Sequence, residues 1–187
     1  MRLTGSYVDM TLSSQEIAAI IENLPTDLDE QRKSAVLNAY SLVGKVNYFW
    51  GGKSTVIGWD SRWGTLTKVT AEGSPTTETV RPFGLDCSGY VTWVFVNAAG
   101  TADAADRIGD GASNQYAACT QIRWSQAQPG DLAFYSDLSH VGIIVCRENG
   151  NLLIANCSSN QNNVVVSSVS DASSSGFYMI GRPQFYQ

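Results

Sequence analysis

The chain has 187 residues, with 12 Lys and Arg against 17 Asp and Glu, four Cys and a single His. Its length and its 43% hydrophobic content suffice for one sizeable buried core. The net charge of −5 and the pI near 4.7 argue against a nucleic-acid partner or an anionic membrane surface. No run of about 18 apolar residues predicts membrane insertion, and the start of the chain lacks the order of a secretion signal, although a removed signal stays open.

The first predicted helix begins with a capping box. Ser13 followed by Glu16 is the pattern in which a side chain and a backbone N–H cap each other. An apolar run follows and ends at Pro25, which cannot continue a helix. The pattern predicts a helix near residues 14–23.

A second helix is predicted before the first glycine-rich motif. Thr26 with Asp29 can start it, and Gly44 stands where a helix C-terminal glycine belongs. We assign residues 1–30 to an N-terminal helical extension and residues 31–187 to a single globular unit.

The middle of the chain changes its pattern. Residues 51–84 are rich in Gly, Thr and Ser with short β-prone pieces, which predicts an irregular excursion or hairpin. Apolar residues then repeat at helical spacing from Cys87 to Ala98, and Gly100 closes the segment. We expect a buried central helix there, with a further short helix near residues 113–119.

The last third of the chain reads as strands. The expected strands cover residues 131–135, 141–146, 152–157, 164–168 and 177–180. The Asn-Gly pair at positions 149–150 supplies the positive φ values of a tight hairpin turn. Helices first and an antiparallel sheet afterwards indicate an α+β fold.

One of the four cysteines stands apart. They form no C-x-x-C pair, and with one His a zinc site would need almost every candidate ligand, so we expect neither a metal nor a disulfide framework. Cys87 lies at the first turn of the predicted central helix, where free backbone N–H groups and the helix dipole favour thiolate. Cys87 is the candidate nucleophile, and the other three are expected to be inert core thiols. The alternative is that Cys87 is one more buried thiol.

A cysteine nucleophile needs a base, and His140 carries the only imidazole of the chain. A solvated loop histidine is the alternative. Asn156, in an otherwise apolar strand, is the candidate to orient the ring. An ideal two-residue turn pairs Ile143 with Asn156 and puts Asn156 on the face opposite His140. A bulge or a three-residue loop would return both side chains to one face.

Four motifs follow one another along the chain. They are Tyr48-Phe49-Trp50-Gly51-Gly52, Asp86-Cys87-Ser88-Gly89-Tyr90, Pro129-Gly130-Asp131-Leu132 and Ser139-His140-Val141-Gly142-Ile143. In this order they resemble the motifs of the NlpC family, which comprises papain-like cysteine peptidases of bacterial cell walls. The similarity covers roughly residues 33–187. It implies a papain-like fold with the nucleophile at the start of a central helix packed on an antiparallel sheet, and it implies no metal or cofactor.

The resemblance also implies roles. Cys87 would attack the amide carbonyl, His140 would act first as base and then as acid, and Asn156 would hold the ring. The third position of the family is commonly His, so Asn156 departs from the commonest version. Tyr48 would lie beside the nucleophile and would bind substrate or help to stabilise the oxyanion.

Further residues are expected around the substrate and the oxyanion. The backbone N–H of Cys87 or Ser88 would stabilise the developing negative charge. Asp86 is expected to fix the turn, and the Ser88 hydroxyl to act as a cap or in packing. Ser139, next to the candidate base, completes this set.

The long segment before the central helix is the main departure from the family pattern. It carries Trp59, Trp63 and Arg81, which are suited to lining a cleft for a short acidic peptide. Surface decoration is the alternative, because loops tolerate insertions.

The resemblance implies an extracellular or cell-wall peptidoglycan endopeptidase. Its substrate would be the stem peptide, cleaved most typically between γ-D-glutamyl and a diamino acid. The alternatives are an N-acetylmuramoyl-L-alanine amidase, another papain-like amidase or acyl transferase, and a wall-binding module of the same fold without turnover. The sequence predicts no oligomeric state.

Overall fold

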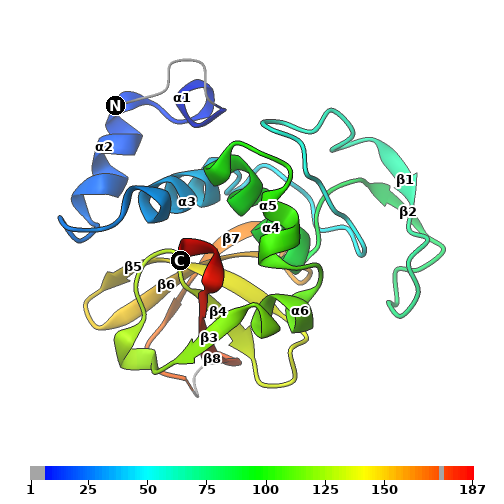
Figure 1. Ribbon diagram of the computed structural model, residues 1–187. Coiled ribbons are helices and arrows are strands. Elements are labelled where there is room, and N and C mark those ends of the chain that lie inside the picture. The colour runs from blue at the N-terminus through cyan, green and yellow to red at the C-terminus, as the bar shows by residue number, and fades with distance from the viewer. Residues whose placement is uncertain (1–6, 173–174) are drawn as a thin grey trace.

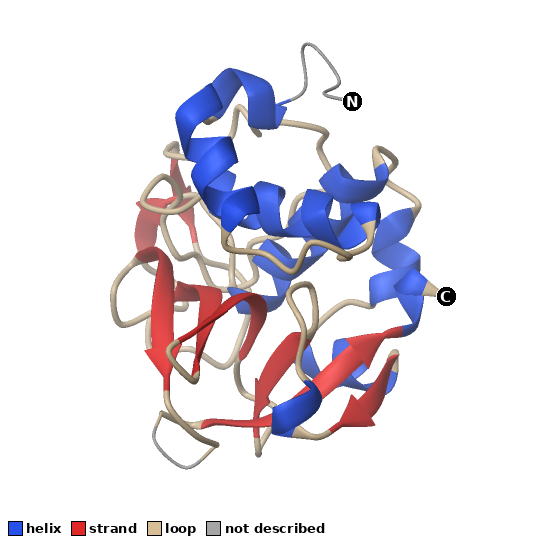
Figure 2. Ribbon diagram, turned by 90° about the vertical axis from the view of Figure 1, so that its left-hand side faces the viewer, coloured by secondary structure: helices blue, strands red, loops and turns tan. Residues whose placement is uncertain are grey.

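Helices collect on one side of an antiparallel sheet in the computed structural model, which describes residues 7–172 and 175–187 (Figures 1 and 2). The six strands of this sheet lie in the order β3-β8-β4-β5-β6-β7. Their bounds are β3 Cys119–Ile122, β4 Leu132–Tyr135, β5 Val141–Glu148, β6 Asn151–Ser158, β7 Asn163–Val169 and β8 Phe177–Pro183. The α+β prediction is confirmed, and β3 is a strand that the sequence did not predict.

Three helices precede the first motif. They are α1 Tyr7–Thr11, α2 Ser14–Glu22 and α3 Glu30–Ser41. The capping box of α2 is present, with Ser13 Oγ and Glu16 Oε1 each accepting the other residue's backbone N–H at 3.0 Å. The N-cap of α3 is Asp29 rather than Thr26, because the Asp29 carboxylate accepts two backbone N–H groups of the first turn. The division of the chain at residue 30 stays a prediction.

The central helix α4 spans Cys87–Ala99 and packs between α3 and the strands β5 and β6. Its large side chains Tyr90, Trp93 and Phe95 are fully buried. Gly100 ends it in the left-handed conformation, with φ at 75°. Two short helices follow, α5 Ala104–Ile108 and α6 Ala112–Ala117. The predicted central helix is thus confirmed, whereas α5 carried no clear sequence signal.

The sheet has apolar contacts on both faces. Successive residues of a strand point to opposite faces, so the neighbours Ile143 and Ile144 belong to different core clusters. The larger cluster lies between the sheet and α3 and α4, and the smaller one on the other face. Two 3-10 turns, η1 Trp124–Gln126 and η2 Gln184–Tyr186, complete the described elements.

The excursion before α4 forms a small hairpin that stands away from the main sheet (Figure 1). Its strands are β1 Leu66–Lys68 and β2 Val80–Pro82. The preceding loop is tied to α4, because Trp93 Nε1 donates to the Gly58 carbonyl at 3.0 Å and Gly58 N donates to Asn97 Oδ1 at 2.7 Å. This confirms the predicted hairpin and anchors its base to the central helix.

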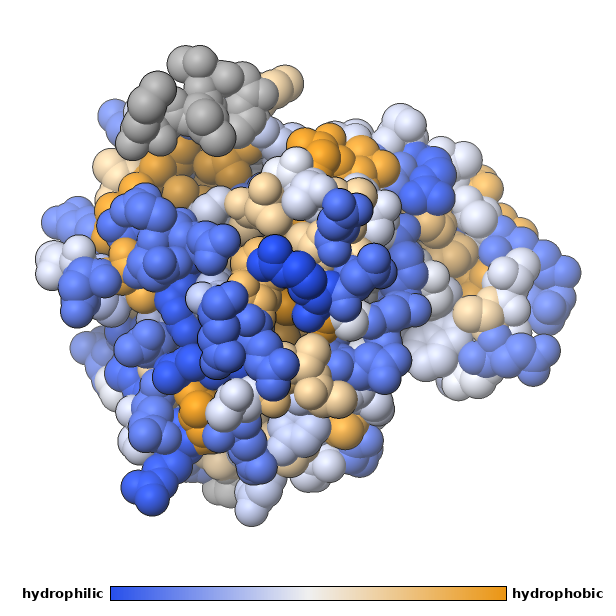
Figure 3. Space-filling view, viewed as in Figure 1, coloured by the Kyte–Doolittle hydropathy of each residue, from blue (hydrophilic) through white to orange (hydrophobic). Residues whose placement is uncertain are grey.

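The face seen in Figure 3 is largely hydrophilic, with apolar residues gathered beside α1 and α2. Met10 and Ile21, on these two helices, are exposed. Within residues 7–172 and 175–187, no helix is both long and apolar enough to cross a membrane.

Candidate active site

Cys87 is the first residue of α4, and the turn before it is held by its neighbour. Asp86 is the N-cap, and its Oδ1 accepts the Gly89 N–H at 2.7 Å. The Cys87 residue is 8% exposed. The backbone N–H groups of Ser88 and of Val141, the residue after His140, lie near enough to the sulfur to lower the pKa of the thiol. The start of α4 and the start of β5 therefore meet at the sulfur.

The Tyr48–Gly52 motif packs directly against the segment that precedes α4. Asp86 N donates to the Gly52 carbonyl at 3.1 Å. A Cβ built on Gly89 would lie 2.1 Å from that same carbonyl oxygen, so only glycine fits there. Tyr48 forms a β-bridge with Leu85, two residues before Cys87. This contact places Tyr48 near the candidate nucleophile.

The β5–β6 hairpin contains the bulge on which the position of Asn156 depends. It starts as a two-residue turn, with φ values of 53° and 83° at residues 149 and 150. A shift of register between Ile144 and Cys146 then pairs Ile143 with Ala155 instead of Asn156. The shift by one residue places Asn156 on the same face as His140.

His140 and Asn156 are hydrogen-bonded through their side chains, with 3.0 Å between His140 Nε2 and Asn156 Oδ1. The amide orientation follows from its other end, because Asn156 Nδ2 lies 3.0 Å from the Ile154 carbonyl oxygen, which can only accept. Asn156 Oδ1 must therefore accept from His140, and Nε2 carries the proton. In the neutral ring Nδ1 is then unprotonated, so its lone pair can accept a proton, as a general base must.

Gly142 makes room for the Asn156 amide. A Cβ at this position would lie 2.6 Å from Ile154 Cγ2, 2.9 Å from the Ala155 carbonyl oxygen and 3.1 Å from Asn156 Cβ. A methyl group here would push β6 away and misplace the amide.

We expect Gly142→Ala to lower kcat/KM by about tenfold or more and to destabilise the fold by about 1–3 kcal/mol, the usual cost of overpacking. The measurements are turnover and thermal unfolding. The control is Asn156→Ala: if Gly142 acts through the amide, the double variant is no slower than Asn156→Ala alone. Fully additive losses in kcat/KM would contradict this role.

The electrostatics of the pair favour neutral groups at rest. Burial raises the pKa of the Cys87 thiol, with a further rise from Asp86, while the Val141 N–H, the Lys53 ammonium and the Ser88 N–H oppose it. Burial lowers the pKa of His140, and the hydrogen bond with Asn156 opposes this. The helix start favours the thiolate through the Ser88 N–H, but burial of the sulfur has the larger and opposite effect on the pKa of the thiol.

A cavity of about 270 Å³ opens beside His140. Its wall includes Tyr48, Asn156 and Ser139 and consists largely of hydroxyl and amide groups. Burial raises the pKa of Tyr48, and the proximity of Cys87 is the next-largest cause of the rise. The Tyr48 phenol is therefore neutral beside the candidate nucleophile and can donate a hydrogen bond.

The hydroxyl groups of the expected oxyanion set are engaged in local structure. Ser88 Oγ donates to Asp86 Oδ1 at 3.1 Å, and Ser139 Oγ donates to Asp137 Oδ1 at 2.6 Å. Asp86 fixes the turn as expected. Ser88 therefore acts on the sulfur through its backbone N–H, which lowers the pKa of the thiol, and not through its hydroxyl.

The expected cleft-lining residues, Trp59, Trp63 and Arg81, do not line the cavity beside His140. Trp63 is buried in the core, with its ring centroid 4.9 Å from that of Trp59 and 6.0 Å from that of Trp93. Arg81 lies on β2, and its Nε donates to Thr79 Oγ1 at 3.0 Å. Trp63 is thus a packing residue at the base of the hairpin, whereas Trp59 packs against it and remains exposed.

The other three cysteines are free thiols, two of them buried and Cys119 half-buried at the edge strand β3. Among the described residues, no three His, Cys, Asp or Glu side chains gather as a metal site. Sequence reasoning missed Lys53, which contacts Asp86 and Ser88. Its position directly after the Gly-Gly of the first motif was the available signal.

The candidate nucleophile at a helix start, the candidate base at a strand start and the candidate orienting amide on the next strand thus lie close together in a mixed fold of helices and antiparallel sheet. The NlpC/P60 family model matches residues 44–182, and the chain belongs to this family. The family comprises peptidoglycan hydrolases, together with relatives described as non-catalytic.

Three relatives illustrate the likeness. Probable endopeptidase p60 of Listeria monocytogenes is 39% identical over 103 residues, which cover 54% of this chain and 19% of p60. The peptidoglycan hydrolase RipB of Mycobacterium tuberculosis superposes with a TM-score of 0.54 at 25% identity, over 97% of this chain and 73% of RipB. RipD of the same organism, described as a non-catalytic NlpC/p60 domain protein, shares the fold with a TM-score of 0.56 at 20% identity, over 83% of this chain and 98% of RipD. The chain spans about a fifth of the length of p60.

Proposed function

We propose that this chain is a cysteine endopeptidase of peptidoglycan that works outside the cell or in the cell wall. The observation that carries the proposal is the convergence of three groups: the Cys87 thiol, the N–H next to His140, and the His140–Asn156 hydrogen bond at 3.0 Å. Membership of the NlpC/P60 family and the likeness to p60 and RipB support the substrate class.

In the proposed reaction His140 is the base. Its Nδ1 takes the thiol proton as the sulfur attacks the amide carbonyl, and Asn156 keeps the ring in the required tautomer. The lowered pKa of His140 keeps the imidazole neutral over more of the acidic range. The imidazolium then gives its proton to the leaving amine, and water hydrolyses the thioester.

The backbone is the proposed source of oxyanion stabilisation. The Gly89 N–H is occupied by Asp86, which leaves the Cys87 and Ser88 N–H groups, without partners within the helix, to stabilise an oxyanion that forms next to Cys87. The Tyr48 phenol lines the cavity beside His140 and would bind the substrate backbone. The cleaved bond that we propose joins γ-D-glutamyl to a diamino acid of the stem peptide.

The test is digestion of purified peptidoglycan, followed by mass spectrometry of the released muropeptides. We expect new amino termini on the diamino acid, and none with Cys87→Ala. Fragments that begin at L-Ala would replace the proposal with an amidase. Wall binding without any new terminus would replace it with a binding module.

A further inference from the structure

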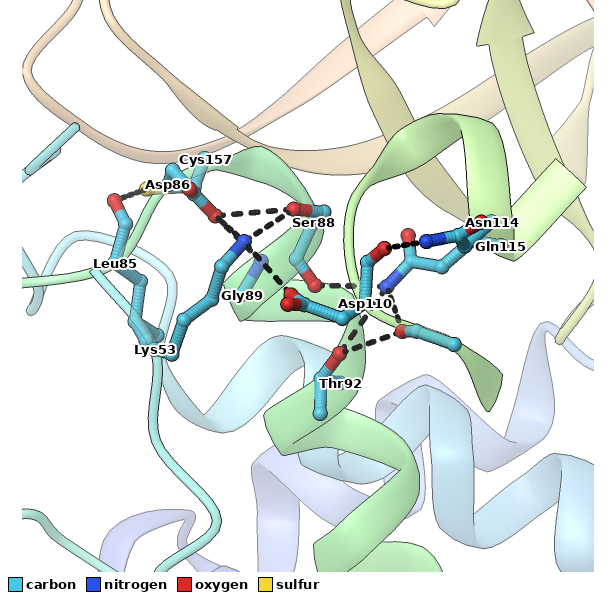
Figure 4. Close-up of polar contacts among 11 residues, drawn as sticks. Lys53, Leu85, Asp86, Ser88, Gly89, Thr92, Asp110, Asn114, Gln115 and Cys157 are labelled. Carbon is cyan, nitrogen blue, oxygen red and sulfur yellow. Dashed lines mark hydrogen bonds and ion pairs between the residues drawn. The ribbon is translucent and has the colours of Figure 1, made fainter. Parts of the chain in front are cut away.

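We propose that Lys53 is a positioning residue that neutralises the Asp86 carboxylate, so that negative charge can form on the sulfur of Cys87. The proposal rests on Cys87 being the nucleophile. Figure 4 shows the Lys53 ammonium between the side chains of Asp86 and Ser88. Lys53 Nζ lies 2.8 Å from Asp86 Oδ1 and 2.6 Å from Ser88 Oγ, the side chains on either side of Cys87 in sequence.

Asp86 creates the need for such a residue. Its Oδ1 caps α4 through the Gly89 N–H at 2.7 Å, so the carboxylate has a structural role. The same carboxylate belongs to a buried residue and is adjacent to the thiol, where it opposes a second negative charge. A cation on this oxygen lets the carboxylate cap the helix without opposing a negative charge on the sulfur.

The backbone fixes Lys53 in place. Gly52, its neighbour, accepts the Asp86 N–H at 3.1 Å and lies against Gly89 without room for a Cβ between them. The Lys53 side chain is 38% exposed, so its ammonium is partly shielded from solvent on the side of α4. A close, partly buried ion pair is weakened less by salt than an exposed one.

A second carboxylate approaches from the turn between α5 and α6. Gln115 Nε2 lies within hydrogen-bond distance of the carbonyl oxygens of Ser88 and Gly109, at 2.9 and 3.2 Å, and so ties this turn to α4. Asp110, in the turn, reaches Lys53 Nζ at 3.4 Å, but its side chain is 82% exposed. Solvent screens that contact, so Asp86 is the main partner of Lys53.

The other titratable groups around the sulfur are neutral near pH 7. Burial raises the pKa of both Tyr48 and Cys157, and it lowers that of His140. Among the described residues, the charged groups that act on Cys87 are thus Asp86 and Lys53, with opposite effects on its pKa.

The experiment measures alkylation of Cys87 by iodoacetamide across pH in the full chain, with the labelled peptide quantified by mass spectrometry. We expect Lys53→Met to raise the apparent thiol pKa by about one unit, which is about a tenfold slower reaction at pH 7. Lys53→Arg should stay close to wild type, because the charge is kept. The control Lys68→Met, which removes the partner of Glu78 on the distant hairpin, should change nothing.

A second variant separates charge from structure. Asn caps helices about as well as Asp, so Asp86→Asn keeps the cap and removes the charge. Lys53→Met combined with Asp86→Asn should therefore restore the alkylation profile toward wild type. An unchanged profile in Lys53→Met, or additive losses in the double variant, would overturn the proposal. Alkylation needs no peptidoglycan. If the shifts in thiol pKa appear but no muropeptide is cleaved, the proposed function is refuted and the role of Lys53 stands.

Discussion

Cys87→Ala is expected to reduce muropeptide cleavage by about a thousandfold or more without loss of folding. In the proposed mechanism the sulfur forms the covalent intermediate, and the hydroxyl of the adjacent Ser88 cannot replace it, because Ser88 Oγ is hydrogen-bonded to Lys53 and Asp86. The measurements are the cleavage rate of a purified muropeptide and the thermal unfolding midpoint.

The control for this variant is Cys119→Ala, which removes a half-buried thiol on β3 and should keep full activity. His140→Ala should reduce the cleavage rate by a comparable factor. The double variant with Cys87→Ala should be no slower than either single variant, because the effects of residues that act as one unit are not additive. Residual cleavage within about tenfold of wild type would show that another group attacks the substrate.

Asp131→Ala is expected to cause the largest loss of stability, about 3–5 kcal/mol. Asp131 is fully buried and lies between two arginines. Its Oδ1 accepts from Arg32 Nη1 at 3.0 Å, and its Oδ2 from Arg182 Nη2 at 2.9 Å and from the Gln128 N–H at 2.8 Å. Arg32 is also buried and lies 4.3 Å from the centroid of the Tyr186 ring, so it would remain as an unpaired charge inside the protein.

The measurement is equilibrium unfolding in denaturant. A chain of this size should also melt about 6–20 °C lower for that loss. The control is Glu30→Ala, which breaks the exposed pair with Lys33 and should cost less than about 0.5 kcal/mol. Equal losses in the two variants would mean that the buried network contributes no more than a surface ion pair.

The predictions that succeeded depend on signals within one element. The capping box of Ser13 and Glu16 and the apolar spacing after Cys87 each operate over a few residues, so sequence alone was enough. The order of the motifs predicted that Tyr48 lies near the segment before Cys87. The sequence left two registers of the hairpin open, and one of them allows the hydrogen bond between His140 and Asn156.

The failures involve contacts between distant segments. Lys53 and Asp86 are 33 residues apart, and no local pattern pairs them. The burial that raises the pKa of Cys87 also depends on the packing of distant segments around the sulfur, which the helix pattern of the sequence does not reveal. The burial of Trp63 could not be predicted either, because aromatic side chains serve packing and recognition alike.

The bulge in β5 also constrains how this hairpin can vary in length. His140 and Asn156 are 16 residues apart, an even number, and the two-residue turn alone would place them on opposite faces. Adding or removing a single residue in the turn would separate them unless the bulge changed at the same time. The lengths of the turn and of the bulge are therefore coupled: a change in one is tolerated only with a compensating change in the other.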